Sequence, residues 1–150
     1  MKLVTIQHKS ILETLNKQGV YHASYSKLKY KHYVKQYKNL AKYCGFSYCP
    51  IFCTPIRNTT AIESSGIYED DEYVKLYLEI PDSRCVELDY YEWSDYLYYS
   101  SGEEYDSYFN FNADEALANI DKYIILGQSR TPQICIQEIY ISDIIDINDI

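Results

Sequence analysis

The clearest indication of the fold is the stretch YVKLYLEI at residues 73–80. Apolar residues alternate there with Tyr, Lys and Glu, which is the period of a β-strand that buries one face. The side chains predicted to point into the core are those of Val74, Leu76, Leu78 and Ile80. The neighbouring elements are placed outward from this strand.

The residues that follow predict a strand and a helix. Pro81 turns the chain, and residues 85–88 have the pattern of a short strand. Asp89 is placed to cap an aromatic helix over residues 90–99, because an aspartate side chain accepts bonds from the free N–H groups of a first turn. A polar loop over residues 100–111 is expected next.

The last third of the chain predicts one more helix and two strands. A helix is expected over residues 112–126, with Asn at its start and Gly after its end. An isoleucine-rich strand over residues 133–141 follows, with a bulge or register change near residues 137–138, because the isoleucines on either side differ in parity. Residues 142–150 alternate acid and Ile and are expected to add a final short strand.

The residues before the central strand begin with another strand. Residues 3–7 alternate apolar and polar side chains. Ser10 and Glu13 have the spacing of a capping box, so the first helix is expected over residues 10–18. Gly19 is expected to end this helix in a left-handed conformation.

A second, longer helix is expected over residues 26–43, ended by Gly45. Residues 49–55 carry two prolines in an apolar run, which predicts an edge strand or an extended loop rather than a central strand. Residues 58–72 are polar and predict a surface loop. Together these elements predict a single α+β domain over residues 1–150, with a mostly antiparallel sheet flanked by three or four helices.

Charge is distributed unevenly along the chain. Residues 1–60 hold ten Lys or Arg and one acid, whereas residues 61–150 hold four bases and twenty-one acids, for a net charge of −8. Five lysines fall mostly on one face of the expected second helix: Lys27, Lys31, Lys35, Lys38 and Lys42. This face could contact phosphates or an acidic surface, or it could be a solvated face beside a buried aromatic stripe. The overall negative charge argues against direct nucleic-acid binding.

The five cysteines predict reduced thiols rather than a metal site. Cys44, Cys49 and Cys53 are close in sequence, but no second pair of ligands follows at a spacing typical of zinc sites. The odd number of cysteines, with no signal peptide and no membrane-spanning apolar run, predicts a location in the bacterial host cytosol without membrane attachment.

Several motifs together resemble a family of bacterial and phage proteins catalogued only as a domain of unknown function. They are MKLVTIQ at residues 1–7, PIF at 50–52, VKLYLEIP at 74–81 and IQEI at 136–139. Members of that family usually carry Trp before the central apolar run and near the late strand, where this sequence has Tyr and Ile. The family itself implies no activity.

The opening of the chain also resembles ADP-ribosyltransferase-type domains, which hold NAD between a first strand and the helix after it. This resemblance implies that Thr5, Gln7, Tyr21 and Gln137 bind NAD or another nucleotide. It implies that Glu138 is the catalytic carboxylate, which would stabilise the positive charge that develops on the ribose. Such a site requires the first strand to lie next to the late strand. In the alternative interpretation, Thr5 and Gln7 are ordinary outward residues of a strand.

Two hypotheses of function follow. In the first, the chain is a small phage or bacterial protein that binds and modulates or inhibits a host or defence protein, with its nineteen tyrosines and its acidic clusters as contact surface. In the second, it is a nucleotide-binding domain of ADP-ribosyltransferase type. The sequence does not decide whether the protein is an enzyme, because it contains neither a G-x-S-x-G motif nor a phosphate-binding glycine loop.

Overall fold

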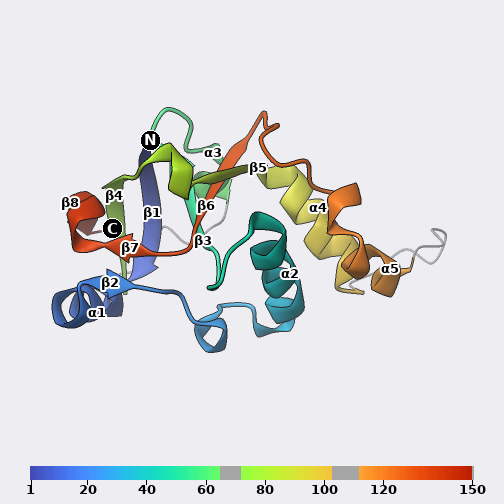
Figure 1. The fold of residues 1–150 in the computed structure, drawn as a ribbon, viewed down its shortest axis with the longest axis horizontal. Coiled ribbons are helices and arrows are strands. Elements are labelled where there is room, and N and C mark those ends of the chain that lie inside the picture. The colour runs from blue at the N-terminus through green and yellow to red at the C-terminus, as the bar shows by residue number, and fades with distance from the viewer. Residues whose placement is uncertain (65–71, 103–111, 150) are drawn as a thin grey trace.

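The computed structural model describes residues 1–64, 72–102 and 112–149. The fold is α+β, as the sequence predicts, with a six-stranded antiparallel sheet of order β5-β6-β3-β1-β4-β8 and a two-stranded sheet β2-β7 (Figure 1). The strands are β1 (Lys2–His8), β2 (Val20–Tyr21), β3 (Ile51–Pro55), β4 (Tyr73–Glu79), β5 (Val86–Asp89), β6 (Pro132–Ile136), β7 (Ile139–Tyr140) and β8 (Ile144–Asp149). The α-helices of the described residues are α1 (Ser10–Gln18), α2 (Val34–Cys44), α3 (Thr60–Ser64), α4 (Tyr90–Ser100) and α5 (Ala113–Ala118). Single 3-10 turns are η1 (Tyr25–Lys27), η2 (Lys31–Tyr33), η3 (Asp82–Arg84), η4 (Ile120–Lys122) and η5 (Ile141–Asp143).

Strands β1 and β4 are neighbouring interior strands of the sheet. They pair along their whole length, from Lys2 opposite Glu79 to His8 opposite Tyr73. The alternation predicted for β4 is confirmed, because the side chains at 74, 76, 78 and 80 are all at most 1% exposed. A strand whose apolar face is covered in this way is stabilised chiefly by burial.

The sheet carries a core on each face. Ile134 and Ile136 of β6 pack in one core with Leu3 and α1, whereas Cys135 between them packs in the other core with Leu40 and Trp93 of the helices α2 and α4. Successive side chains of a strand point to opposite faces, so the two cores lie on opposite sides of β6. Figure 1 shows α2, α4 and α5 gathered at the β5 end of the sheet, and α1 with the small sheet at the other end.

The first helix begins and ends where the sequence predicts, but not with the predicted cap. Lys9 is the N-cap residue and makes no side-chain cap bond, so the proposed capping box is wrong. Ser10 is held by His8, whose Nδ1 lies 2.9 Å from the Ser10 hydroxyl, and Glu13 pairs with Lys17 at 2.7 Å. Gly19 ends the helix with φ 75°, as predicted.

The helix predicted over residues 26–43 is shorter than expected. The chain makes the turns η1 and η2 before α2 starts at Val34. Ser24, not Ser26, is the capping residue, since its side chain accepts from the Ser26 N–H, and Leu28 then extends the chain with ψ 135°. Serine side chains favour such local turns over a continuous helix. Gly45 ends α2 with φ 77°, as predicted.

The segment with two prolines is an interior strand, contrary to the prediction. Strand β3 lies between β1 and β6. Pro50 precedes the strand and Pro55 is its last residue, so the residues between them keep the N–H groups that both neighbours need. The polar stretch after β3 also contains the short helix α3, and its residues 65–71 lie outside the described part of the chain.

The helix predicted over residues 112–126 also stops early. Asn112 caps α5 as expected, accepting from two N–H groups of the first turn. The Asn119 side chain, however, donates to the Glu115 carbonyl at 2.7 Å, and the chain leaves the helix there before entering η4. Of the loop predicted over residues 100–111, residues 103–111 lie outside the described part.

The late strand is interrupted at residues 137–138, as the change of parity predicts. The interruption is larger than a bulge, because β6 belongs to the main sheet while β7 pairs with β2 in the small sheet. The tail then returns to the main sheet as β8, the expected final strand, beside β4.

Candidate functional site

The first predicted site residues, Thr5 and Gln7, contact each other on β1. Thr5 is fully buried, and its hydroxyl donates to the Phe52 carbonyl of β3 at 2.8 Å. The same hydroxyl oxygen accepts from Gln7 Nε2 at 2.9 Å. Thr5 is therefore not an outward strand residue, and its hydrogen bonds are made inside the sheet rather than toward a ligand.

Tyr21 lies on β2 and is paired with Ile139 of β7. Its side chain is half-buried against the core that contains α1. Burial, followed by the nearby Cys49 thiol, raises the pKa of the Tyr21 hydroxyl. A phenol in this state is protonated at neutral pH and can act only as a hydrogen-bonding group.

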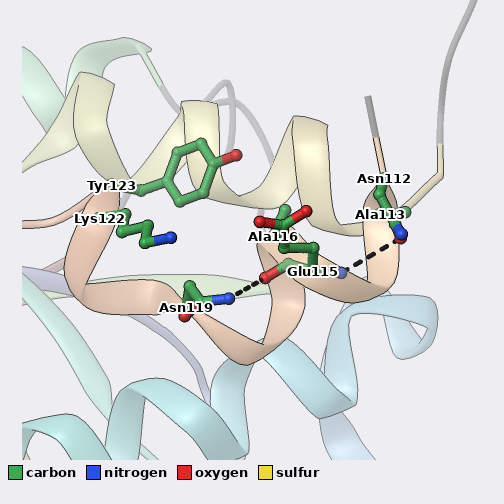
Figure 2. A pocket seen from close by; sticks show the side chains of 7 residues that line it. All are labelled: Asn112, Ala113, Glu115, Ala116, Asn119, Lys122 and Tyr123. Carbon is green, nitrogen blue, oxygen red and sulfur yellow. Dashed lines mark hydrogen bonds between the residues drawn. The ribbon is translucent and has the colours of Figure 1, made fainter. Parts of the chain in front are cut away.

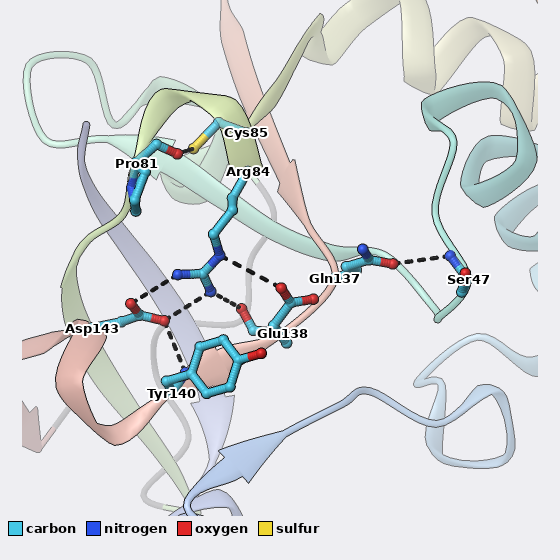
Figure 3. A network of polar contacts seen from close by, with 8 residues as sticks. All are labelled: Ser47, Pro81, Arg84, Cys85, Gln137, Glu138, Tyr140 and Asp143. Carbon is cyan, nitrogen blue, oxygen red and sulfur yellow. Dashed lines mark hydrogen bonds and ion pairs between the residues drawn. The ribbon is translucent and has the colours of Figure 1, made fainter.

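Gln137 and Glu138 occupy the link between β6 and β7 and are engaged within the fold (Figure 3). Gln137 accepts from the Ser47 N–H at 2.9 Å. The Glu138 carboxylate lies 3.5 Å from Nε of Arg84, which is the distance of an ion pair rather than of a well-formed hydrogen bond. A cation beside Glu138 opposes the stabilisation of positive charge that the transferase resemblance assigns to this carboxylate.

Arg84 is the centre of a polar network that sequence reasoning missed. Its two terminal nitrogens donate to the two Asp143 oxygens at 2.9 Å each, and one of them also donates to the Glu138 carbonyl at 3.1 Å (Figure 3). Asp143 further accepts from the Tyr140 N–H at 2.8 Å, and the guanidinium lies 5.0 Å from the Tyr140 ring centre. The hydrogen bond to Asp143 raises the pKa of Arg84, although burial lowers it. The rarity of bases in the acidic half of the chain was the available signal.

The structure therefore brings the predicted residues together in two separate groups. Thr5 and Gln7 are bonded to each other, and Tyr21 lies across from the residue that follows Glu138. The adjacency of the first and late strands that such a site requires does not occur, because β3 lies between β1 and β6. The roles assigned to these five residues stay predictions.

Two surface hollows among the described residues are lined by other side chains than these. One, of about 860 Å³, lies along α5 and η4 and is lined by Asn112, Ala113, Glu115, Ala116, Asn119, Lys122 and Tyr123 (Figure 2). Two of its amides already cap α5 or bond its last turn. The other, of about 170 Å³, lies beside α3 over Val4 and Tyr77. Neither combines an enclosed apolar pocket with converging polar groups, which is what small-molecule sites require.

The lysines of residues 27–42 form a different kind of candidate. No acid occurs between Glu13 and Glu63 in the sequence. We define the basic surface by its exposed lysines and by the rings beside them, which are Lys27, Lys29, Lys31, Lys35, Lys38, Lys42, His22, Tyr25, Tyr30 and Tyr48. Within residues 1–64, 72–102 and 112–149, none of these six lysines forms an ion pair with a carboxylate. Within the described part of the chain, no carboxylate neutralises their charge.

The inner face of α2 explains why its lysines point outward. Leu40 is fully buried, and Gln36, 3% exposed, donates to the Ser100 hydroxyl at 3.2 Å. Asn39 donates to the Tyr96 hydroxyl at 3.1 Å and to the Leu117 carbonyl at 3.0 Å. The polar side chains of this face are thus used against α4 and α5, and only the lysine face remains toward solvent.

Two rings of the basic surface have a lysine beside them, Tyr30 with Lys29 and Tyr25 with Lys38, and a further ring pair lies at the start of the same segment. His22 and Tyr48 stack with ring centres 3.8 Å apart, held by the bridge between Ala23 and Cys49. Tyr48 and Tyr30 remain 45% and 48% exposed. Tyr30 lies within the helix expected over residues 26–43 and is exposed because turns replace that part of the helix.

The thiols and the described acids do not assemble a metal site. Within the described residues, no group of three or more His, Cys, Asp or Glu could hold a metal ion. All five cysteines are free, and burial raises the pKa of Cys49 to about 11 and that of Cys53 further. These thiols are protonated at neutral pH and are therefore poor nucleophiles.

Comparisons with known proteins add no relative. No protein-family model matches the sequence, and no curated protein and no solved structure shows significant similarity to it. Among the described helices, none has the length and apolar character needed to span a membrane.

Proposed function

We propose that the protein acts by binding, as a small interaction protein that engages an acidic macromolecular partner, such as a host or defence component, through the basic surface. The observation that carries the proposal is the set of six exposed lysines without a described carboxylate partner. Clustered charges of one sign repel each other and are not needed for the fold, whereas they accelerate the encounter with an oppositely charged partner.

The nucleotide-binding alternative has less support. Thr5 and Gln7 bond to each other, Gln137 binds the backbone of Ser47, and Glu138 lies beside Arg84. A ligand would have to break these contacts before it could use the same groups. The cost of leaving buried polar groups unpaired is about 1–3 kcal/mol each.

Retention on immobilised heparin, a generic polyanion, tests the proposal. We expect replacement of Lys31, Lys35 and Lys38 by Glu to lower the salt concentration of elution strongly, because surface charges act through a field that salt screens. The control replaces Lys2, Lys9 and Lys122 by Glu, which changes the net charge equally at exposed positions outside the basic surface. Equal loss of retention in the two variants would show that net charge, and not this surface, controls binding.

A further inference from the structure

The charge of the basic surface does not explain its exposed rings, and these identify the class of partner. We propose that the acidic partner is a single-stranded nucleic acid, an inference that rests on the binding function proposed above. Lysines alone would bind any polyanion and would not distinguish a nucleic acid from an acidic protein. The Tyr30 ring has the Lys29 ammonium 5.6 Å from its centre and so adds a flat apolar face beside positive charge. The Tyr48 ring adds a second face: it stacks on His22 at 3.8 Å, and the bridge between Ala23 and Cys49 places it near the start of the segment that carries Tyr25 and Lys27.

Proteins that bind single strands combine these two features. A basic track follows the phosphates while aromatic side chains stack on unpaired bases, and this works for any sequence because every base has a π-face. Tyr48 and Tyr30 are each nearly half exposed, so their rings are accessible. A further lysine and ring lie together where η1 meets α2: the Lys38 ammonium of α2 is 5.4 Å from the centre of the Tyr25 ring of η1.

The orientation of α2 argues against recognition of base pairs in a nucleic-acid duplex by this helix. Base pairs of a duplex are identified in the major groove chiefly by Arg or Lys on guanine and by Asn or Gln on adenine. On α2 the two amides, Gln36 and Asn39, point inward and bond to α4 and α5. The outward lysines of α2 can bind phosphates or guanine, but the helix presents no outward amide to identify adenine. The surface is therefore suited to a strand with exposed bases and to little discrimination between sequences.

The net charge of −8 argued against nucleic-acid binding at the level of the whole chain. The relevant quantity is local, because charges farther than about 10 Å are screened at 0.1 M salt. Six lysines that contact six phosphates of a single strand would give a slope of log K against log salt of about −4. Binding is expected to be weak at high salt for the same reason.

The experiment measures fluorescence anisotropy of a labelled oligothymidylate of about 15 nucleotides, with the matching duplex, heparin and poly-L-glutamate as competitors. The test variant replaces Tyr30 and Tyr48 by Leu, and the control replaces Tyr91 and Tyr98, which are 55% and 38% exposed on α4, by Leu. Circular dichroism verifies that each variant is folded. We expect the test variant to lose at least about tenfold in affinity for the single strand and to keep its retention on heparin, and the control to change neither.

Several results would overturn the inference, and they separate it from the proposed function. Equal affinity for single strand and duplex, or no loss in the Tyr30/Tyr48 variant, would remove the role of the rings. Binding of heparin and poly-L-glutamate through the basic surface without binding of the oligonucleotide would identify an acidic protein as the partner and leave the proposed function intact. Binding of none of the polyanions would reject both.

Discussion

In the Arg84 network positive charge is paired within the fold, whereas on the basic surface it is exposed to solvent. Arg84 is half-buried, and its guanidinium is surrounded by two carboxylates, a carbonyl and a ring. The six lysines of the basic surface are exposed, and none is paired with a described carboxylate. A cation whose donors are used inside the fold stabilises that fold, whereas a cation left in water is available to a partner. The proposed binding therefore depends on charge that the fold does not use, rather than on the amount of charge.

The largest effect is expected from breaking the Arg84 network. Asp143→Ala removes two charge-assisted bonds to Arg84 and leaves the guanidinium without its main partner. We expect the free energy of unfolding, measured by urea denaturation, to fall by about 3 kcal/mol. The control is Lys17→Ala, which removes an exposed pair with Glu13 and should cost less than about 0.5 kcal/mol. Similar losses in the two variants would contradict the contrast between buried and exposed cations.

A smaller loss of stability is expected from replacing Asp89, whose two carboxylate oxygens each accept two backbone hydrogen bonds. Its carboxylate caps α4 through the Tyr91 and Glu92 N–H groups and also accepts from the N–H groups of Arg130 and Thr131 at 3.0 Å each. Asp89→Ala should lower the free energy of unfolding at pH 7 by about 2 kcal/mol, as the loss of an N-cap and of two further bonds.

The same carboxylate predicts a pH dependence. Burial raises the pKa of Asp89, but the four backbone hydrogen bonds together lower it below its ordinary value. Its contribution is complete above the unfolded pKa of about 4 and is lost as the pH falls through the lower folded value. The stability difference between wild type and Asp89→Ala should therefore narrow below about pH 4. Asp95→Ala, at an exposed acid of the same helix, is the control for loss of a carboxylate that caps no helix.

Tyr96→Phe tests the hydrogen bonds that hold the inner side of α2 against α4 and α5. The Tyr96 hydroxyl donates to the Leu117 carbonyl at 2.8 Å and accepts from Asn39 at 3.1 Å. Its removal should lower the free energy of unfolding by about 1 kcal/mol, because the ring stays and two hydrogen bonds are lost. Tyr91→Phe, on the exposed side of α4, should change stability by less than about 0.5 kcal/mol. A Tyr96 variant as stable as wild type would show that these bonds do not hold α2 in place.

The lysine substitutions that should weaken binding most are expected to change stability least. Replacing Lys31, Lys35 and Lys38 by Glu should change the free energy of unfolding by no more than about 0.5 kcal/mol, since all three side chains are exposed and none is paired with a described carboxylate. Urea denaturation of the variant used for heparin retention measures this directly. A loss of several kcal/mol would mean that these lysines belong to the fold, as Arg84 does.

The sequence by itself determined the features that depend on neighbours in the chain. The alternation over residues 73–80, the Asp89 and Asn112 caps, and the left-handed Gly19 and Gly45 are all found as predicted. Each follows from a period of side chains or from a backbone preference that acts within a few residues.

Tertiary structure decided the features that depend on distant residues. The interior place of β3 requires β1 and β6 on either side of it, and the engagement of Glu138 requires Arg84, which lies 54 residues earlier in the chain. The two amides of α2 are removed from its surface by contacts with Ser100, Tyr96 and Leu117. A side chain's availability depends on what packs against it, and local pattern carries no information about partners that only the folded chain brings together.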